Sequence, residues 1–68
     1  MPIAIVVNGK PTWLEDKVCL SDFLAERGID PNSVVVEHNL AIIPTEELSN
    51  KIINENDKLE ILRFVGGG

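Results

Sequence analysis

The first fourteen residues alternate in hydrophobicity and predict a β-hairpin. Apolar residues at positions 3, 5 and 7 have the period of two that is typical of a strand. Asn8-Gly9 follows, and this dipeptide favours a type I′ turn because both central residues of that turn need positive φ. Residues 10–14 then return as the second strand. In this register the opposed pairs are Val7 and Lys10, Ile5 and Thr12, Ile3 and Leu14, and, on the other face, Ala4 and Trp13.

A single helix is predicted after the polar connection at residues 15–17. Three apolar residues at i, i+3 and i+4 form one stripe of a helix, and these are Leu20, Phe23 and Leu24. Gly28 fits the C′ position that ends the helix. Two residues compete for the N-cap: Ser21 has the better capping chemistry, whereas Cys19 agrees better with the apolar stripe.

The remaining pattern predicts short strands separated by turns. In chain order we expect a strand at 34–36, a turn at 38–40, a partner strand at 41–43, a helical turn at 44–48 capped by Thr45, a turn at 54–57 and a last strand at 59–65. One helix against a mixed sheet of four or five strands is an α+β fold. The long separation between the first hairpin and the last strand allows these two to pair in parallel, which is the β-grasp topology.

Composition limits the chain to one small domain with few classes of partner. A chain of 68 residues buries only about 60% of the surface that its unfolded form exposes. The net charge of −5 repels phosphate backbones, so nucleic acid is not an expected partner. Negative charge suits a basic protein surface, although it also simply keeps a small protein soluble. No apolar run approaches the ~20 residues of a membrane span, so we expect no membrane partner.

The number of cysteines and the first residues of the chain indicate the cellular compartment in which we expect the protein. The single cysteine, Cys19, allows no internal disulfide and no metal cluster, which fits a reducing, cytoplasmic environment. We interpret it as a small, half-buried residue. The start, Met1-Pro2, lacks the basic region of a secretory signal and predicts a mature protein.

Three glycines, Gly66, Gly67 and Gly68, close the sequence directly after an apolar segment. Glycine has no Cβ, so this run forms a thin, flexible lead that presents a bare terminal carboxylate to a narrow enzyme pocket. The alternative is an ordinary frayed terminus. We therefore divide the chain into a β-grasp domain at 1–65 and a flexible C-terminal glycine tail at 66–68.

Several stretches of the chain resemble the ThiS family, the sulfur-carrier proteins of thiamine biosynthesis. They are Val6-Val7-Asn8-Gly9, Phe23-Leu24, Val36-Glu37 followed by Ile43-Pro44, and Arg63-Phe64-Val65-Gly66-Gly67-Gly68. The resemblance covers nearly the whole chain, and the terminal hexapeptide is its most specific part. It implies the ubiquitin-like β-grasp fold.

The resemblance implies a protein substrate and not an enzyme. A separate adenylating enzyme of the ubiquitin-activating type would use ATP to activate the carboxylate of Gly68. Sulfur from a donor enzyme would then replace the AMP and give a thiocarboxylate, which a thiazole synthase would accept. Gly66 and Gly67 would thread into the activating enzyme, and the carrier itself would bind neither cofactor nor metal.

Two residues depart from the family pattern. Leu40 follows Asn39 where a glycine is usual. Because leucine is unfavourable at positive φ, we expect this turn to differ locally from that of the family. Asn56 also replaces a common glycine, but asparagine tolerates the left-handed region, so we expect little change there.

Exposed apolar residues predict a docking surface. If the hairpin register holds, Trp13 and Ala4 lie on the sheet face away from the helix. Leu62 and Phe64 alternate onto one face of the last strand, so we expect one apolar patch close to the tail. Trp and Phe are common anchors of interfaces. Alternatively, Trp13 folds over a sheet edge and covers the small core.

Other polar residues offer no catalytic centre. His38 is the only histidine, and we interpret it as a solvent-exposed turn residue. Asp22 and Glu26 lie four apart on one helical face, and we interpret them as a solvated surface.

Two other functions are compatible with the same tail. The small subunit of molybdopterin synthase would share the fold and the activation but would have a different sulfur acceptor. A ubiquitin-like modifier would join Gly68 to a lysine, or would act only as an interaction module.

Overall fold

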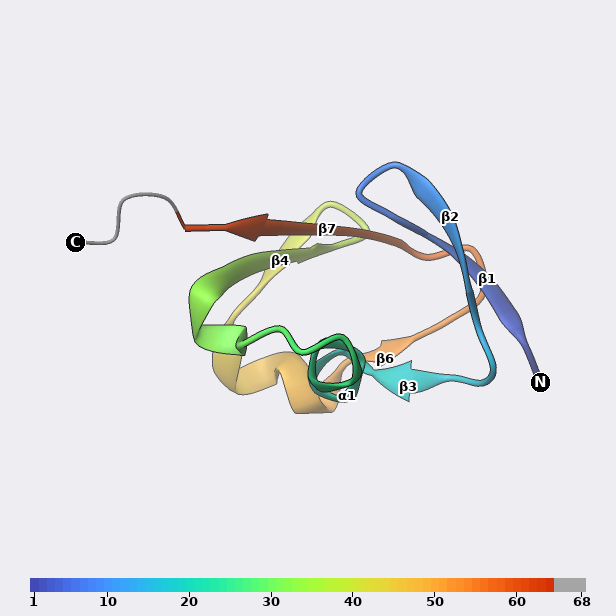
Figure 1. The fold of residues 1–68 in the computed structure, drawn as a ribbon, viewed down its shortest axis with the longest axis horizontal. Helices are drawn as coiled ribbons and strands as arrows, with labels where there is room; N and C mark the ends of the chain where they lie inside the picture. The colour runs from blue at the N-terminus through green and yellow to red at the C-terminus, as the bar shows by residue number, and fades with distance from the viewer. Residues whose placement is uncertain (65–68) are drawn as a thin grey trace.

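The computed structural model describes residues 1–64. Its elements are β1 (Ile3–Val7), β2 (Lys10–Leu14), β3 (Val18–Cys19), α1 (Leu20–Glu26), the 3₁₀ helix η1 (Pro31–Ser33), β4 (Val34–His38), β5 (Ala41–Ile43), the 3₁₀ helix η2 (Thr45–Asn50), β6 (Ile52–Ile53) and β7 (Lys58–Arg63). Within residues 1–64 the strands form a five-stranded sheet, β2-β1-β7-β4-β5, and a two-stranded sheet, β3-β6. Figure 1 shows α1 and the β3-β6 pair on the side opposite β7.

The β1-β2 hairpin has the predicted register. Ile3 pairs with Leu14, Ile5 with Thr12 and Val7 with Lys10, and Ala4 opposes Trp13. Asn8 and Gly9 form the turn with φ of 50° and 80°. Alternation and turn chemistry together therefore determine this element from local sequence alone.

The last strand lies in the middle of the sheet. β7 pairs in parallel with β1 at Val6–Lys58 and Val7–Leu59. On its other side it runs antiparallel to β4 over five residue pairs, from Val34–Arg63 to His38–Leu59. This parallel contact between the first and last strands confirms the ubiquitin-like β-grasp fold, with a mixed sheet and one main helix.

Apolar side chains from the sheet and from α1 form one core. The buried residues are Ile3, Ile5, Leu20, Phe23, Leu24, Val34, Val36, Leu48, Ile53 and Leu59. They include the whole predicted stripe of α1 and the inward positions of β1. Alternation along each strand sends these residues to a single side of the sheet, which leaves the other face without a covering element among the described residues.

The ends of α1 follow the expected backbone chemistry in part. Gly28, at φ 70°, donates its N–H to the Ala25 carbonyl at 3.1 Å, and the Ile29 N–H reaches the Leu24 carbonyl at 2.9 Å. This pair of bonds is a Schellman motif. Cys19 and not Ser21 occupies the N-cap position, where its side chain makes no capping bond.

Some boundaries differ from the sequence-based expectation. The β3-β6 pair was not predicted, because two-residue strands carry no periodic signal. Thr45 is the first residue of η2 and not its cap, a position that Pro44 takes without a side-chain hydrogen bond. β7 begins one residue earlier than predicted, at Lys58, and ends at Arg63.

The β4-β5 turn corrects the expectation for Leu40. Asn39 and Leu40 have φ of 53° and 75°, so leucine occupies the left-handed position directly and the turn does not change to avoid it. Leu40 is 88% exposed, so its side chain gains little from burial there. Asn56 has φ 71°, as expected for an asparagine that replaces glycine.

We predict that Leu40→Gly stabilises the protein. Relief of left-handed strain, about 1–2 kcal/mol, outweighs the larger unfolded-state entropy of glycine, which leaves a net gain of about 0.5–1 kcal/mol. Urea denaturation would measure it as a higher midpoint with an unchanged slope. Gly9→Ala is the matched control in the other hairpin, because an added Cβ there meets nothing within 4 Å at φ +80°, so strain alone should lower its midpoint. A lower midpoint for Leu40→Gly would contradict the strain argument.

Candidate functional site

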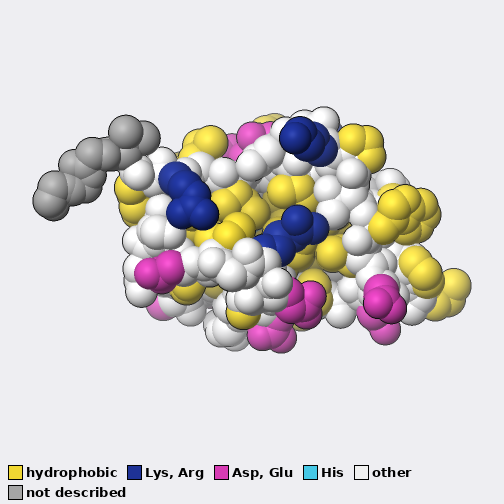
Figure 2. All heavy atoms as spheres, viewed as in Figure 1, with side chains coloured by type: hydrophobic (Ala, Val, Ile, Leu, Met, Phe, Trp, Pro, Cys, Tyr) yellow, Lys and Arg dark blue, Asp and Glu magenta, His cyan; other side chains and the backbone are white. Residues whose placement is uncertain are grey.

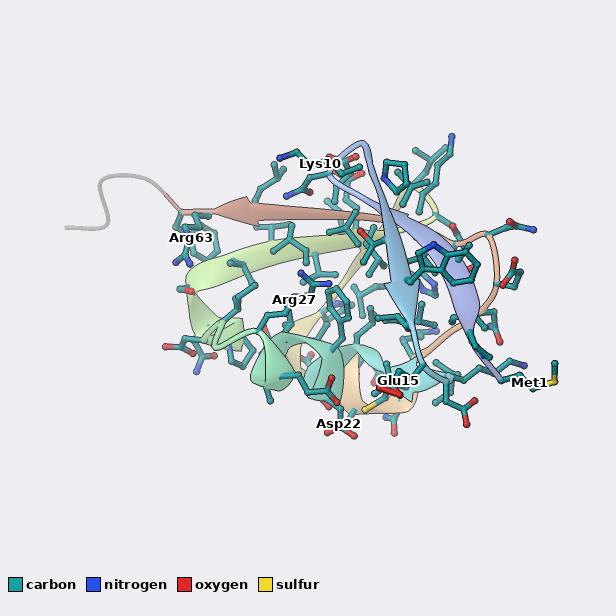
Figure 3. All side chains as sticks on the ribbon, turned by 45° about the vertical axis from the view of Figure 1, so that its right-hand side comes forward. Met1, Lys10, Glu15, Asp22, Arg27 and Arg63 are labelled. Atoms are coloured by element: carbon teal, nitrogen blue, oxygen red, sulfur yellow. The ribbon has the colours of Figure 1, made fainter. Side chains whose placement is uncertain are left out.

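The base of the C-terminal segment is fixed on the central strand of the sheet. The Phe64 N–H donates to the Ser33 carbonyl at 3.1 Å, which continues the pairing beyond the end of β7. Figure 3 shows Arg63 at this end of the strand. Gly66, Gly67 and Gly68, and Val65 of the predicted last strand, lie outside the described residues. The described structure therefore defines where the tail begins.

Apolar side chains flank this point. Leu62 is 51% exposed and Phe64 62% exposed. Leu62 lies opposite Val35 of β4, on the sheet face away from the core. Ile42 of β5, opposite Glu37, adds a further exposed side chain. This group, Leu62, Phe64, Val35 and Ile42, is called here the tail-proximal patch.

Trp13 and Ala4 form a separate apolar area. Trp13 is 73% exposed, so it does not fold over the core. The Asn56 N–H donates to the Ala4 carbonyl at 2.7 Å, which places Ala4 beside Asn56. Leu62 is six residues further along the chain, about 20 Å at the rise of a strand. The expectation of one continuous patch close to the tail was wrong, because parallel pairing of β1 with β7 puts Ala4 and Trp13 at the opposite end of the sheet.

Basic side chains are present on the surface despite the net charge of −5. Figure 3 labels Lys10 beside the β1-β2 turn, Arg27 after α1 and Arg63 at the end of β7. In the space-filling view, hydrophobic side chains reach the surface between basic ones over the middle of the visible face (Figure 2). Arg27 also lies 4.6 Å from the centre of the Phe23 ring, a cation–π distance. The acidic excess is therefore not uniform over the surface.

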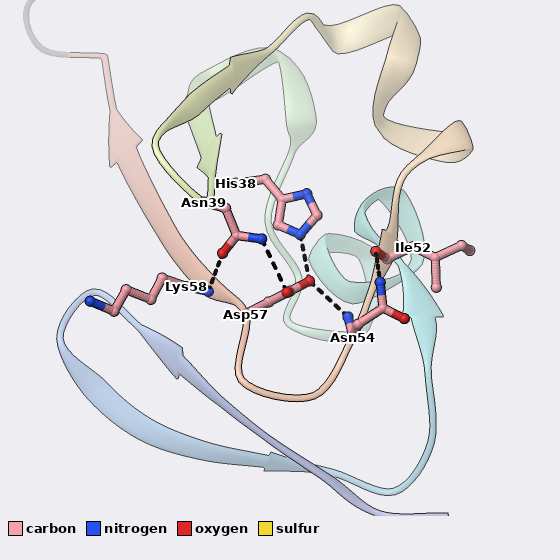
Figure 4. Close-up of polar contacts among 6 residues, drawn as sticks. All are labelled: His38, Asn39, Ile52, Asn54, Asp57 and Lys58. Atoms are coloured by element: carbon pink, nitrogen blue, oxygen red, sulfur yellow. Dashed lines mark hydrogen bonds and ion pairs between the residues drawn. The ribbon is translucent and has the colours of Figure 1, made fainter.

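His38 belongs to a half-buried polar cluster and is not the solvent-exposed turn residue that we expected. Its side chain is 13% exposed, and its Nε2 lies 2.6 Å from Asp57 Oδ2. The Asn54 backbone N–H also donates to Asp57 Oδ2, at 2.8 Å, and Asn39 Nδ2 donates to Oδ1 at 3.1 Å (Figure 4). Sequence reasoning missed this cluster because its members come from the end of β4, the β4-β5 turn and the loop before β7, which only the fold brings together.

The contacts of this cluster connect separate parts of the fold. Three of the four contacts join His38 and Asn39 to Asp57 and Lys58 at the start of β7, the fourth closes the loop between Asn54 and Asp57, and Asp57 is 9% exposed. Every buried side-chain nitrogen and oxygen in the described part of the chain has a hydrogen-bond partner. Residues 1–64 hold no group of three or more histidine, cysteine or carboxylate side chains that could bind a metal ion.

The environment of Asp57 changes its acidity. Burial raises its pKa, but hydrogen bonds from the Asn54 backbone, His38 and Asn39 outweigh burial and hold the pKa below its ordinary value of 3.8. A carboxyl group with a lowered folded-state pKa contributes stability above its unfolded pKa and loses it as pH falls through the folded value.

We therefore predict that Asp57 makes the protein acid-labile below about pH 4. The free energy of unfolding should fall as the pH drops below the ordinary carboxyl pKa of 3.8, and Asp57→Asn should flatten that fall because its amide does not titrate in this range. Urea titrations at a series of pH values would measure the slope. An equally steep acid limb in Asp57→Asn would assign the lability to other carboxyl groups.

Cys19, Asp22 and Glu26 have the surroundings that the sequence indicated. Cys19 is half-buried, with its Sγ 3.2 Å from Ser21 Oγ. Asp22 and Glu26 are exposed on α1. No helix within the described part of the chain has the length and apolar character needed to cross a membrane.

Three comparisons with known proteins indicate the same family. The model of the ThiS family matches residues 3–68. The sulfur carrier protein ThiS of Bacillus subtilis is 36% identical over 63 residues, which cover 91% of this chain and 96% of that protein. The crystal structure of the thiamine biosynthesis protein ThiS from Geobacter metallireducens has a TM-score of 0.85 at 26% identity, and the match covers 97% of this chain and 100% of that one.

Longer proteins also contain a similar segment. A thiazole synthase of Paramagnetospirillum magneticum is 38% identical over 64 residues, and one of Magnetococcus marinus is 33% identical over 64 residues. Each match covers 94% of this chain but only 20% of the synthase. The chain thus spans about one fifth of the length of these two relatives.

Proposed function

Because the chain belongs to the ThiS family, we propose that it is a sulfur carrier of thiamine biosynthesis and acts as a protein substrate. The observation that carries this proposal is that the family match runs from β1 through Gly68 and so includes the complete glycine tail. The fold supports it, because β7 supplies a firmly paired strand from which that tail begins.

The chemistry of the carrier is centred on Gly68. A carboxylate is a poor electrophile, so an adenylating enzyme first joins it to AMP from ATP, with release of pyrophosphate. Hydrosulfide released by a donor enzyme then attacks the acyl carbon and displaces AMP as the leaving group, and a thiocarboxylate remains on the carrier. Gly66 and Gly67 give this group a lead without side chains, which a narrow channel can admit.

The tail-proximal patch supports docking to the adenylating enzyme. Leu62 and Phe64 stand beside the tail and expose apolar surface, as anchors of an interface do. From Phe64, the remaining four residues can reach at most about 14 Å when fully extended. The active site of the partner must therefore lie close to the docked patch. Trp13 and Ala4 lie about 20 Å from Leu62, which is within the breadth of a standard protein interface of about 800 Å² per partner, so their part in docking stays a prediction.

A thiazole synthase is the proposed sulfur acceptor. Two proteins of that name contain a segment similar to nearly all of this chain. A carrier joined to its acceptor works at a high effective concentration, which favours direct transfer of sulfur over its loss to water.

Intact-mass spectrometry tests the proposal. The protein is incubated with ATP, a ThiS-activating enzyme and a sulfur donor, and we expect the mass increase of one oxygen-to-sulfur exchange. Omission of ATP is the control and should leave the mass unchanged. A covalent adduct with a lysine of another protein would instead indicate a modifier, and transfer of the sulfur only to a molybdopterin synthase partner would indicate the other sulfur-carrier pathway. Either result would overturn the proposed function.

A further inference from the structure

Both hairpin turns of the sheet use an asparagine side chain to bind the backbone of β7. Asn8 begins the β1-β2 turn and Asn39 begins the β4-β5 turn, at φ of 50° and 53°. Asn39 Oδ1 accepts the Lys58 N–H at 2.8 Å, at the first residue of β7 (Figure 4). Asn8 binds β7 from the other side and near its other end.

The side chain of Asn8 replaces the next residue of β1. Asn8 Oδ1 accepts the Ile61 N–H at 2.7 Å, and Asn8 Nδ2 donates to the Ile61 carbonyl at 3.3 Å. Its own backbone N–H donates to the Leu59 carbonyl at 2.9 Å. A strand neighbour would satisfy the same two groups of Ile61, so the amide extends the sheet where the main chain turns away.

This extension matters because β1 is short beside β7. Their parallel register contains only Val6–Lys58 and Val7–Leu59 before the chain turns at Gly9. On the opposite side, pairing with β4 continues to Arg63, and the Phe64 N–H bond to Ser33 extends it further. Without the Asn8 amide, β7 from Ile61 onward would be held on one side only, like an edge strand.

We propose that Asn8 is a positioning residue that fixes the tail-bearing end of β7 for the adenylating enzyme. This inference rests on the proposed carrier function. A partner that binds the tail must order the strand end from which the tail starts, and a strand end that is already ordered reduces this entropic cost. The effect should therefore appear in binding, as a higher KM, with little change in kcat.

Asn39 supplies the matched control. It has the same residue type, the same left-handed backbone and a similar side-chain bond to β7. Its contact, however, lies at Lys58, five residues before Arg63. Glycine at either position keeps positive φ without strain and removes the side-chain amide, which at position 39 binds both the Lys58 N–H and Asp57 Oδ1. Each variant therefore loses two side-chain hydrogen bonds, and those lost in Asn39→Gly lie farther from the tail.

The experiment combines amide hydrogen exchange with steady-state ATP-dependent activation by a ThiS-activating enzyme. In Asn8→Gly we expect the Ile61 amide to exchange about tenfold faster or more, because it loses its acceptor. We expect kcat/KM for activation to fall about tenfold through KM. Asn39→Gly should expose the Lys58 amide and leave kcat/KM within about twofold of the wild-type chain. Asn8→Asp keeps the acceptor for the Ile61 N–H, so its KM should lie between those of Asn8→Gly and the wild-type chain.

Several results would overturn the positioning role. One is equal kcat/KM for Asn8→Gly and the wild-type chain, and another is an equal loss in Asn8→Gly and Asn39→Gly, which would indicate general destabilisation. Unchanged exchange at Ile61 would show that the side-chain bonds do not hold the strand. If the wild-type chain itself is not activated, the carrier function fails and the positioning role falls with it, while the exchange data still report on the contact between Asn8 and Ile61.

Discussion

A chain shortened by Gly68 alone is expected to accept neither AMP nor sulfur. Removal of one residue withdraws the terminal carboxylate by about 3.5 Å. Misplacement of a reacting group by about 1 Å can already cost about 100-fold in rate, so we expect a loss of more than 100-fold. ATP–pyrophosphate exchange and intact mass would measure the loss. The thermal midpoint of the shortened chain is the control and should equal that of the full chain.

Gly67→Val tests the width of the channel that admits the tail separately from the length of the tail. This variant keeps the length of the tail but adds a branched side chain next to the terminal residue. If the tail must enter a narrow channel, we expect activation to fall to a similar extent, whereas a wide pocket would tolerate valine. Sulfur loading of the chain that lacks Gly68 would refute the role of the terminal carboxylate, and normal turnover of Gly67→Val would refute the narrow channel.

Asp57→Ala is expected to give the largest loss of stability among polar substitutions. The change leaves His38, the Asn54 N–H and the Asn39 amide without their shared acceptor. Unsatisfied buried polar groups cost about 1–3 kcal/mol each, and partial access to water reduces this, so we expect a loss of about 2–4 kcal/mol. A domain of this length has a total stability of only about 3–10 kcal/mol.

Urea denaturation would measure this loss directly. Asp16→Ala is the control, because the Asp16 side chain is 75% exposed and binds only the chain terminus and its neighbour. We expect that variant to unfold almost as the wild-type chain does. An equally small effect for Asp57→Ala would show that water replaces the carboxylate in the cluster.

Local sequence patterns predicted the parts of the fold that local chemistry determines. Alternation around Asn8-Gly9 predicted the hairpin and its register, and the stripe ending before Gly28 predicted α1. The order of elements predicted the parallel pairing of β1 with β7, and the family resemblance implied the same fold. For the site, sequence predicted the exposure of Leu62 and Phe64, since alternation along one strand is a local property.

Features that depend on distant parts of the chain were not predictable. Asp57 and His38 are 19 residues apart, and nothing in their spacing indicates a contact. The same holds for Asn8 and Ile61, 53 residues apart. The prediction for the turn at Leu40 was wrong for a different reason: a strained backbone position is tolerated when the surrounding hairpin determines it. Trp13 is separated from the tail because β1 and β7 run in parallel, and the relative direction of two strands cannot be read from either strand alone.

The central position of β7 also has a consequence for biosynthesis. The innermost strand of the sheet is synthesised after all the other described strands, and β1 and β4 have no partner between them until it is present. Contacts between such distant segments form slowly, so folding should be completed only after translation has passed residue 63. A nascent chain that stops short of that point would remain open and prone to degradation. The chain would thus fold only once it contains the strand from which the proposed reactive tail begins.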